Sequence, residues 1–183
     1  MKYMNLQMFA EVVKGKKIVW LYRVHEDAAT VDGATLAFAT EDALSVSADA
    51  DSTQTKDGVV RTPAQPELEK TGTSLFMKGD ETPDTYRKAM LDNKLFDLWR
   101  ADLEQPVTGQ ENKFKGTYYQ GYLTSFEETA NAEDFVEFSW TFGINGKGAD
   151  GDVTVTTEQQ EAAAYVFVDT PRGATGATGA TGA

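Results

Sequence analysis

Side chains able to carry nucleophilic or metal chemistry are scarce in this sequence. Among 183 residues there is one histidine, His25, and no cysteine, which excludes disulfides and thiolate metal sites. A catalytic serine would depend on His25, and no nucleophile-elbow motif accompanies it. A transition-metal site would need that histidine together with carboxylates, and a lone histidine is more often structural. We therefore expect no catalytic residue, no metal site and no cofactor.

One acidic run begins like a calcium-binding loop and then departs from the pattern. Asp49 and Asp51 open it, but Gln54 stands where a glycine is needed and Val60 where the final glutamate should be. A second acidic stretch, 150–152, is typical of a solvated turn. Calcium binding is therefore not the favoured interpretation of either stretch.

A glycine-rich stretch at 143–148 has some features of a phosphate-binding loop. Its spacing is wrong, and Gly148 follows Lys147 where serine or threonine is required. No helix pattern follows, so no helix N-terminus is available to hold a phosphate. Carboxylates are numerous without forming a recognisable acid–base frame, although a pair brought together from distant parts of the chain stays open.

The charge balance restricts the partners. There are 29 acidic and 17 basic residues, giving a net charge of −12 and a sequence pI near 4.5. Such a surface repels phosphate, which argues against tight nucleic-acid binding but allows DNA to pass nearby. The longest apolar run, 18–22, is far shorter than the roughly 20 residues that span a bilayer. The N-terminus lacks the unbroken apolar centre of a signal peptide, so we expect a soluble protein without membrane association.

The element that organises the chain is the stretch 114–144. From residue 135 its side chains alternate strictly, as in a strand with one buried face and one wetter face. The residues expected in the core are Val136, Phe138, Trp140, Phe142 and Ile144. Residues 115–127 are rich in Tyr, Phe and Thr, which favour strands, and 128–133 are small and polar. The pattern predicts a long antiparallel hairpin.

Shorter segments complete a mainly β fold. A helix is expected over 83–93, with Thr82 as its N-cap, Pro83 in its first turn and a favourable Asp84–Lys88 pair. Residues 145–152 are expected to form a turn, and 158–164 are compatible with helix. The remaining expected strands are 18–24 (buried on both faces), 36–39, 44–47, 67–77, 95–103, 152–156 and 165–168.

Residues 48–67 form a long polar segment. About 20 residues of this composition inside a compact domain are usually functional or disordered. The dipeptide Asp57-Gly58 followed by two valines favours a protruding hairpin, with Thr53 and Thr55 on the opposing strand. We expect a β-sandwich or barrel with one flanking α-helix, this long protruding loop and extended N- and C-terminal arms.

The two ends of the chain differ from its centre. Residues 1–15 show no sustained period and are interpreted as an arm, and 16–168 as the β-sandwich domain. From Gly173 onward glycine recurs at every third residue, as in collagen. That repeat is too short for a stable triple helix, so 169–183 is interpreted as a flexible linker or the start of a longer appendage.

Four stretches together resemble a known family. They are GKKIVWLYR, DSTQTKDG, YYQGYLTSFEETANAEDFVEFSWTFGINGKG and TTEQ, of which TKDG and NAEDFVEFSWTFGINGKG are the most specific. Over 15–168 the chain resembles the major tail proteins of long, non-contractile-tailed phages of Gram-positive bacteria. Proteins of that family look like β-sandwiches with a flanking helix, similar to the tube protein of type VI secretion systems. The resemblance implies a non-enzymatic virion protein made in the host cytoplasm.

The resemblance also implies how the protein works. Family members form hexameric rings that stack into a tube carrying DNA and the tape-measure protein, and a tail terminator and distal tail or baseplate proteins are the further partners. The lumen is built from the long hairpins of neighbouring subunits, and a long loop reaches the next ring. The lumen-facing candidates in this chain are Glu127, Glu137, Ser139 and Thr141. The inter-ring candidates are Asp49, Asp51, Thr55, Lys56, Asp57, Gly58 and Arg61.

Two other classes of function remain as alternatives. A carbohydrate- or cell-surface-binding β-sandwich could use Tyr118, Tyr119 and Tyr122 as a stacking surface, although packing within the sheet is the favoured role of these tyrosines. A hydrolase is the least supported alternative, because no reactive set accompanies it. Rings or tubes in negative-stain micrographs would distinguish the assembly protein from both.

Overall fold

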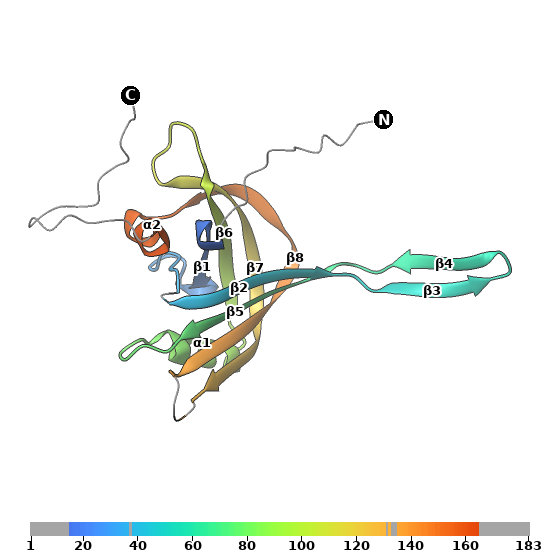
Figure 1. Ribbon diagram of the computed structural model, residues 1–183, viewed down its shortest axis with the longest axis horizontal. Helices are drawn as coiled ribbons and strands as arrows, with labels where there is room; N and C mark the ends of the chain where they lie inside the picture. Colours follow the sequence, from blue (N-terminus) through green and yellow to red (C-terminus); the bar gives the residue numbers. More distant parts are fainter. Residues whose placement is uncertain (1–14, 37, 131, 133–134, 165–183) are drawn as a thin grey trace, which may run out of the picture.

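The described part of the chain is built around one antiparallel β-sheet. The computed structural model describes residues 15–36, 38–130, 132 and 135–164 (Figure 1). The six-stranded sheet has the order β1-β6-β7-β8-β5-β2. Its strands are β1 (Ile18–Val24), β2 (Ala39–Ser47), β5 (Glu67–Leu75), β6 (Leu95–Pro106), β7 (Lys113–Thr129) and β8 (Glu137–Thr154). The predicted mainly β fold is confirmed.

The remaining elements are short. A separate two-stranded ribbon pairs β3 (Ala50–Thr55) with β4 (Gly58–Pro63). The helices are α1 (Thr82–Leu91) and α2 (Thr157–Ala164), with 3-10 turns at Gly15–Lys17 and His25–Asp27. Among the described residues no helix is long and apolar enough to cross a membrane. The arms expected at 1–15 and 169–183 and the strand expected at 165–168 lie, apart from Gly15, outside the described residues.

The sheet curls so that β1, at one edge, packs against β8 and β2. Tyr22 of β1 stacks on Phe142 of β8, with ring centroids 5.8 Å apart. The Tyr22 hydroxyl also donates a hydrogen bond to Asp42 of β2 at 3.2 Å, which joins the two edge strands. The two layers of the expected sandwich are therefore parts of one curled sheet.

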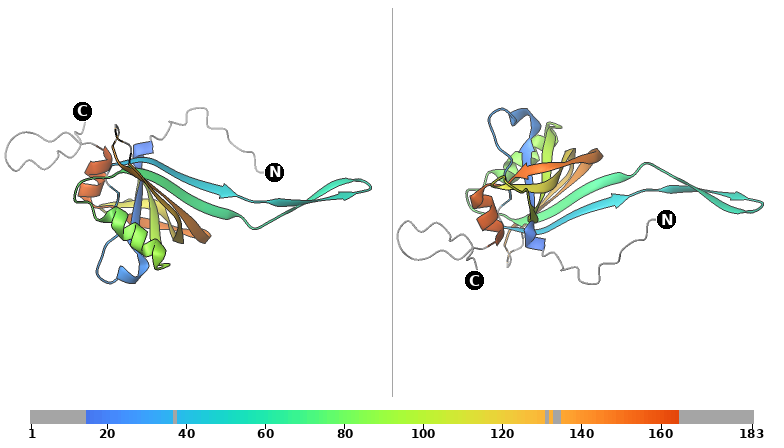
Figure 2. Two further views of the ribbon diagram at one scale, coloured as in Figure 1. Left: turned by 90° about the horizontal axis from the view of Figure 1, so that it is seen from below. Right: turned by 90° about the horizontal axis from the view of Figure 1, so that it is seen from above.

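Helix α1 closes the open side of this roll, as the views along the sheet show (Figure 2). Its buried Tyr86 contacts Phe96, Trp140 and Phe142, with ring centroids 5.4, 6.0 and 6.0 Å away. Aromatic pairs at such edge-to-face geometry add to the stability that burial provides. The helix therefore covers the aromatic core between the two layers of the sheet.

The start and the charge pairing of α1 differ from prediction. Thr82 is not the N-cap: Glu81 occupies that position, and the backbone N–H of Thr82 donates to Asp80 Oδ1 at 2.9 Å. The ion pair that Asp84 makes is with Arg87, its i, i+3 neighbour, at 2.7 Å, and not with the predicted Lys88. Both ends of that pair are exposed, so solvent screens it and it contributes little to stability.

Strands β7 and β8 form the predicted long hairpin, and β8 continues beyond it. Phe138, Trp140 and Phe142 are buried in the core, while Val136 and Ile144 are partly buried. The turn predicted at 145–152 is wrong, since β8 pairs with β7 as far as Thr154. The ladder shifts register between Tyr118 and Gln120, where the strand bulges. A Cβ at Gly148, whose φ is +76°, would lie 2.5 Å from the Tyr119 ring, so glycine lets the strand continue across that side chain.

Strand β1 is buried on both faces, as its composition predicted. Trp20 and Tyr22 face the aromatic core, while Val19 and Leu21 join a second cluster with Phe114 and Val155. The strand predicted at 36–39 is wrong for most of its length, because β2 begins only at Ala39. Upstream of it, Ala34 bridges Tyr22 and Leu36 packs against the core, so tertiary contacts replace regular pairing there.

Candidate functional site

Over β8, the adjoining half of β7, β5 and β2, one face of the sheet carries glutamates and hydroxyls, and none of the paired residues there is basic. On β8 these side chains alternate with the buried Phe138, Trp140 and Phe142, and therefore point to the opposite side. The pairing extends the same face across β7, β5 and β2, since Ser139 lies opposite both Glu127 and Thr73, and Thr73 opposite Glu41. We call this surface the acidic face. It consists of Glu41, Ser45, Ser47, Glu67, Glu69, Thr71, Thr73, Ser125, Glu127, Glu137, Ser139 and Thr141.

The four lumen-facing candidates all lie on the acidic face. Glu127 and Ser139 are direct cross-strand neighbours, and Glu137 and Thr141 flank Ser139 along β8. Both glutamates are exposed, whereas Ser139 and Thr141 are half-buried. Within the described residues no group of three His, Asp or Glu side chains could hold a metal ion. The acidic face can therefore repel an anion, but it has no constellation for catalysis.

The inter-ring candidates lie on a ribbon that stands clear of the body. Every residue of β3 and β4 is exposed, and the ribbon extends far beyond the sheet (Figure 1). The predicted turn forms at Lys56 and Asp57, and Gly58 follows with a φ of +134°. Asp51 and Thr55 lie on β3 and Arg61 on β4. Asp49 precedes β3, and its carbonyl oxygen accepts a hydrogen bond from the Ala64 N–H at 2.8 Å.

The sequence analysis did not identify a buried carboxylate, Asp97, which lies on β6, away from the acidic face. Asp97 of β6, with a side chain 2% exposed, accepts hydrogen bonds from Arg23 Nη2, His25 Nδ1, Tyr118 Oη and Gln120 Nε2. These contacts measure 2.8, 2.8, 2.6 and 3.3 Å respectively. The partners come from two segments, 23–25 and 118–120, and both are far from Asp97 in the sequence. The one signal available was a carboxylate on the same face of an apolar strand as Trp99 and Ala101.

The surroundings of Asp97 fix its charge. Burial by itself would raise the pKa of Asp97, but the hydrogen bonds from Tyr118, Arg23, His25 and Gln120 outweigh burial and lower that pKa to about 2. Burial together with the neighbouring Asp97 raises the pKa of Tyr118 to about 12. The carboxylate is thus saturated by groups of the same chain, and His25 has a structural role.

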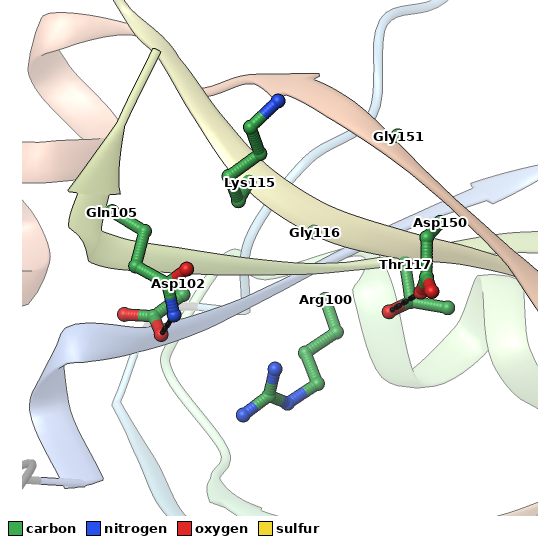
Figure 3. Close-up of a pocket in the computed structure, with 8 residues that line it drawn as sticks. All are labelled: Arg100, Asp102, Gln105, Lys115, Gly116, Thr117, Asp150 and Gly151. Atoms are coloured by element: carbon green, nitrogen blue, oxygen red, sulfur yellow. Dashed lines mark hydrogen bonds between the residues drawn. The ribbon is translucent and has the colours of Figure 1, made fainter.

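A shallow polar depression lies between β6, β7 and β8 (Figure 3). It has a volume of about 470 Å³, and Gly116 and Gly151 are part of its lining. Thr117 Oγ1 donates to Asp150 at 2.9 Å, and Lys115 pairs with Asp152 at 2.6 Å. Both carboxylates of the acidic stretch 150–152 therefore already have partners within the chain. The depression mixes both signs of charge and brings together no reactive set.

The three tyrosines do not form a common stacking surface. Tyr119 is buried and stacks on Trp20, with centroids 6.0 Å apart. Tyr118 is held by Asp97 and lies 5.5 Å from Trp99, on the opposite side of the sheet from Tyr119. Only Tyr122 is largely exposed, at 44%. This geometry removes the observation on which the carbohydrate-binding alternative depended.

Comparison with known proteins identifies the family. A family model described as phage tail tube protein matches residues 12–150. The chain belongs to the phage tail tube protein family. A tail protein of Staphylococcus phage phiMR25 is 33% identical over 146 residues, covering 78% of this chain and 76% of the relative. The resemblance drawn from the sequence is confirmed, and this tail tube protein is a structural, non-enzymatic component of the virion tail.

Solved structures show the same fold. The SPP1 tail tube protein superposes with a TM-score of 0.63 at 21% identity, covering 82% of this chain and 85% of that one. A chain from the tail of a gene transfer agent particle, solved with C6 symmetry, gives a TM-score of 0.57 at 12% identity and covers 75% and 98%. A chain from the sixfold-symmetrised baseplate of the anti-feeding prophage gives 0.54 at 4% identity and covers 80% and 98%. The tail tube fold therefore extends across proteins with little sequence in common.

Proposed function

We propose that six copies of this tail tube protein close into a ring, and that stacked rings form a tube whose lumen is lined by the acidic face. The observation that carries the proposal is that five glutamates and no lysine or arginine occupy the acidic face. A surface chosen only for solubility would mix both signs of charge. The sixfold symmetry of the related gene transfer agent tail and anti-feeding prophage baseplate supports the ring size.

An acidic lumen suits the transport of DNA. Carboxylates repel the phosphate backbone, so DNA passes without the counterion release that makes basic surfaces bind it tightly. The short hydroxyl side chains between the glutamates, such as Ser139 and Thr141, offer no bulky obstruction. The tape-measure protein would occupy the same lumen before ejection, and the tail terminator and the distal tail or baseplate proteins would meet the two ends of the tube.

The β3–β4 ribbon is proposed to join successive rings. Its residues are all exposed, and a two-stranded hairpin is marginally stable alone in water. Contact with a neighbouring subunit would stabilise it. The inter-ring candidates Asp49, Asp51, Thr55, Lys56, Asp57, Gly58 and Arg61 lie on or beside this ribbon.

The lumen assignment is tested by reversing charge on the acidic face. A phage carrying Glu127→Lys and Glu137→Lys is expected to assemble tails of normal length but to eject DNA more slowly, because lysines in the lumen attract phosphate. Glu158→Lys on α2, outside the acidic face, is the matched control and should leave ejection unchanged. An ejection rate equal to that of the wild type in the double variant would sink the assignment.

The stacking assignment is tested by removing the ribbon. Replacing residues 53–61 with an Asn-Gly turn preserves a hairpin of allowed geometry. The variant should give the far-ultraviolet circular dichroism of a folded β protein and no tubes in negative-stain micrographs. Long tubes from this variant would contradict the role of the ribbon.

A further inference from the structure

The β2–β5 ladder ends in two different exposed surfaces. At one end it leads into the β3–β4 ribbon (Figure 1). At the other end lie four large exposed hydrophobic side chains, which we call the apolar rim. The apolar rim consists of Phe38, Phe76, Met77 and Phe135, which are 59%, 37%, 41% and 80% exposed.

The members of the apolar rim come from three adjacent strand ends. The Leu75 N–H donates to the Phe38 carbonyl oxygen at 3.3 Å, and the Phe76 N–H donates to the Val136 carbonyl oxygen at 2.7 Å. The four side chains thus belong to neighbouring backbone positions. Single exposed hydrophobic residues are ordinary, but a cluster of aromatic and Met side chains marks an interaction surface.

The ribbon has the properties of a matching partner. Val59 and Val60 are 58% and 55% exposed, so its two faces each offer an apolar side chain. Residues 50–63 hold two acidic and two basic side chains and are therefore neutral, whereas the chain carries −12. Because copies of an acidic protein repel one another, a neutral segment is the part that most easily approaches another copy.

The geometry of the ladder excludes contact between the two surfaces of one copy. β2 and β5 stay paired from Ala39 opposite Ser74 to Ser47 opposite Glu67, which separates the ribbon from the rim. The ribbon projects away from the body on the side opposite the end of β5 (Figures 1 and 2). A shift of one copy along the ladder direction brings its ribbon toward the rim of the next.

We propose that the apolar rim of one subunit receives the β3–β4 ribbon of a second copy of this chain in the neighbouring ring. The inference rests on the proposed function and assigns the receiving surface. The contact joins two different patches, so two bound copies still offer one free ribbon at one end and one free rim at the other. A heterologous contact repeated by a shift along the tube axis does not close into a ring and propagates as a filament.

The absence of cysteine makes a crosslinking test unambiguous. The full-length chain is prepared with one cysteine on the ribbon, Val59→Cys or Val60→Cys, and one on the rim, Met77→Cys or Phe135→Cys. Tubes are assembled, oxidised and run on a denaturing gel without reductant. At least one of the four pairs is expected to give a ladder extending beyond dimers, because each copy is linked to a copy on either side. Reductant should return the ladder to monomer.

The controls separate this inference from the proposed function. Single-cysteine variants can give dimers at most, and Val60→Cys combined with Val31→Cys, an exposed valine outside the rim, should give no ladder. Tubes in which none of the four pairs forms a ladder overturn the assignment of the rim and leave the proposed function intact. A wild-type protein that forms neither rings nor tubes overturns both.

A second test needs no cysteine. Phe76→Ser combined with Phe135→Ser should yield single rings in place of tubes, and long tubes from that variant also contradict the inference.

Discussion

The aromatic core contains a buried lysine, Lys70 of β5, whose ion-pair partner Asp42 is partly exposed. The Lys70 side chain is 0% exposed, and its Nζ lies 4.8, 5.8 and 5.9 Å from the ring centroids of Trp20, Tyr22 and Trp140. Burial lowers the pKa of Lys70, and Asp42, which contacts its Nζ at 2.5 Å, opposes that shift. The side chain of Asp42 is 31% exposed and can be hydrated when unpaired. The two partners therefore have unequal roles.

Removing Asp42 is expected to cost more than removing Lys70. Asp42→Ala leaves a buried ammonium group without its counterion, which destabilises the fold by about 3–5 kcal/mol. Lys70→Met places an apolar chain of similar length among the rings and leaves a partly hydrated carboxylate, so its cost should be well below that of Asp42→Ala. Urea denaturation measures both, and the double variant should resemble Lys70→Met. Equal losses from the two single variants would contradict the asymmetry.

Asp97 gives the fold a defined acid sensitivity. Its pKa falls from 3.8 to about 2 on folding, so its contribution is complete above about pH 4 and is lost as the pH falls toward 2. The shift corresponds to a loss on the order of 2 kcal/mol. Asp97→Asn should be less stable at neutral pH and should show a shallower decline in unfolding free energy below pH 4. Asp57→Asn, on the exposed ribbon, is the control and should keep the wild-type decline.

At the scale of elements, helix α1 depends on a residue that precedes it. Asp80 accepts a hydrogen bond from the Thr82 N–H, while Thr82 lies inside the helix and makes no capping bond with its side chain. Asp80→Ala should therefore cost about 1 kcal/mol of unfolding free energy. Thr82→Ala should cost nothing through helix propensity, because alanine is the better helix former. Thermal unfolding of the two variants checks this order. The reverse order would mean that Thr82 caps the helix in solution.

The elements that the sequence predicted well are those whose signal is local. Strict alternation over 136–144 predicted β8, and an Asp-Gly dipeptide predicted the ribbon, because side-chain period and turn chemistry act over a few residues. The stretch 145–152 looked like a turn, yet its glycines let β8 cross Tyr119 and pair with β7. The Asp97 cluster joins β1, β6 and β7, and a contact between residues 23 and 97 leaves no local pattern. The path of residues 145–152 and the Asp97 cluster therefore depend on contacts between distant segments, which a local sequence pattern does not reveal.

At the scale of the whole molecule, assembly brings together copies that each carry −12. Long-range repulsion between them falls as salt shortens the Debye length from about 30 Å at 0.01 M to about 8 Å at physiological ionic strength. The proposed contact between ribbon and rim is apolar and neutral, so screening should not weaken it. Tube growth, followed by light scattering, is therefore expected to accelerate as sodium chloride rises over this range.

Tubes of the double variant Glu127→Gln with Glu137→Gln should grow faster than wild-type tubes at low salt, and the two growth rates should converge at high salt. Growth that slows with added salt would show that pairs of opposite charge, and not apolar contacts, join the subunits.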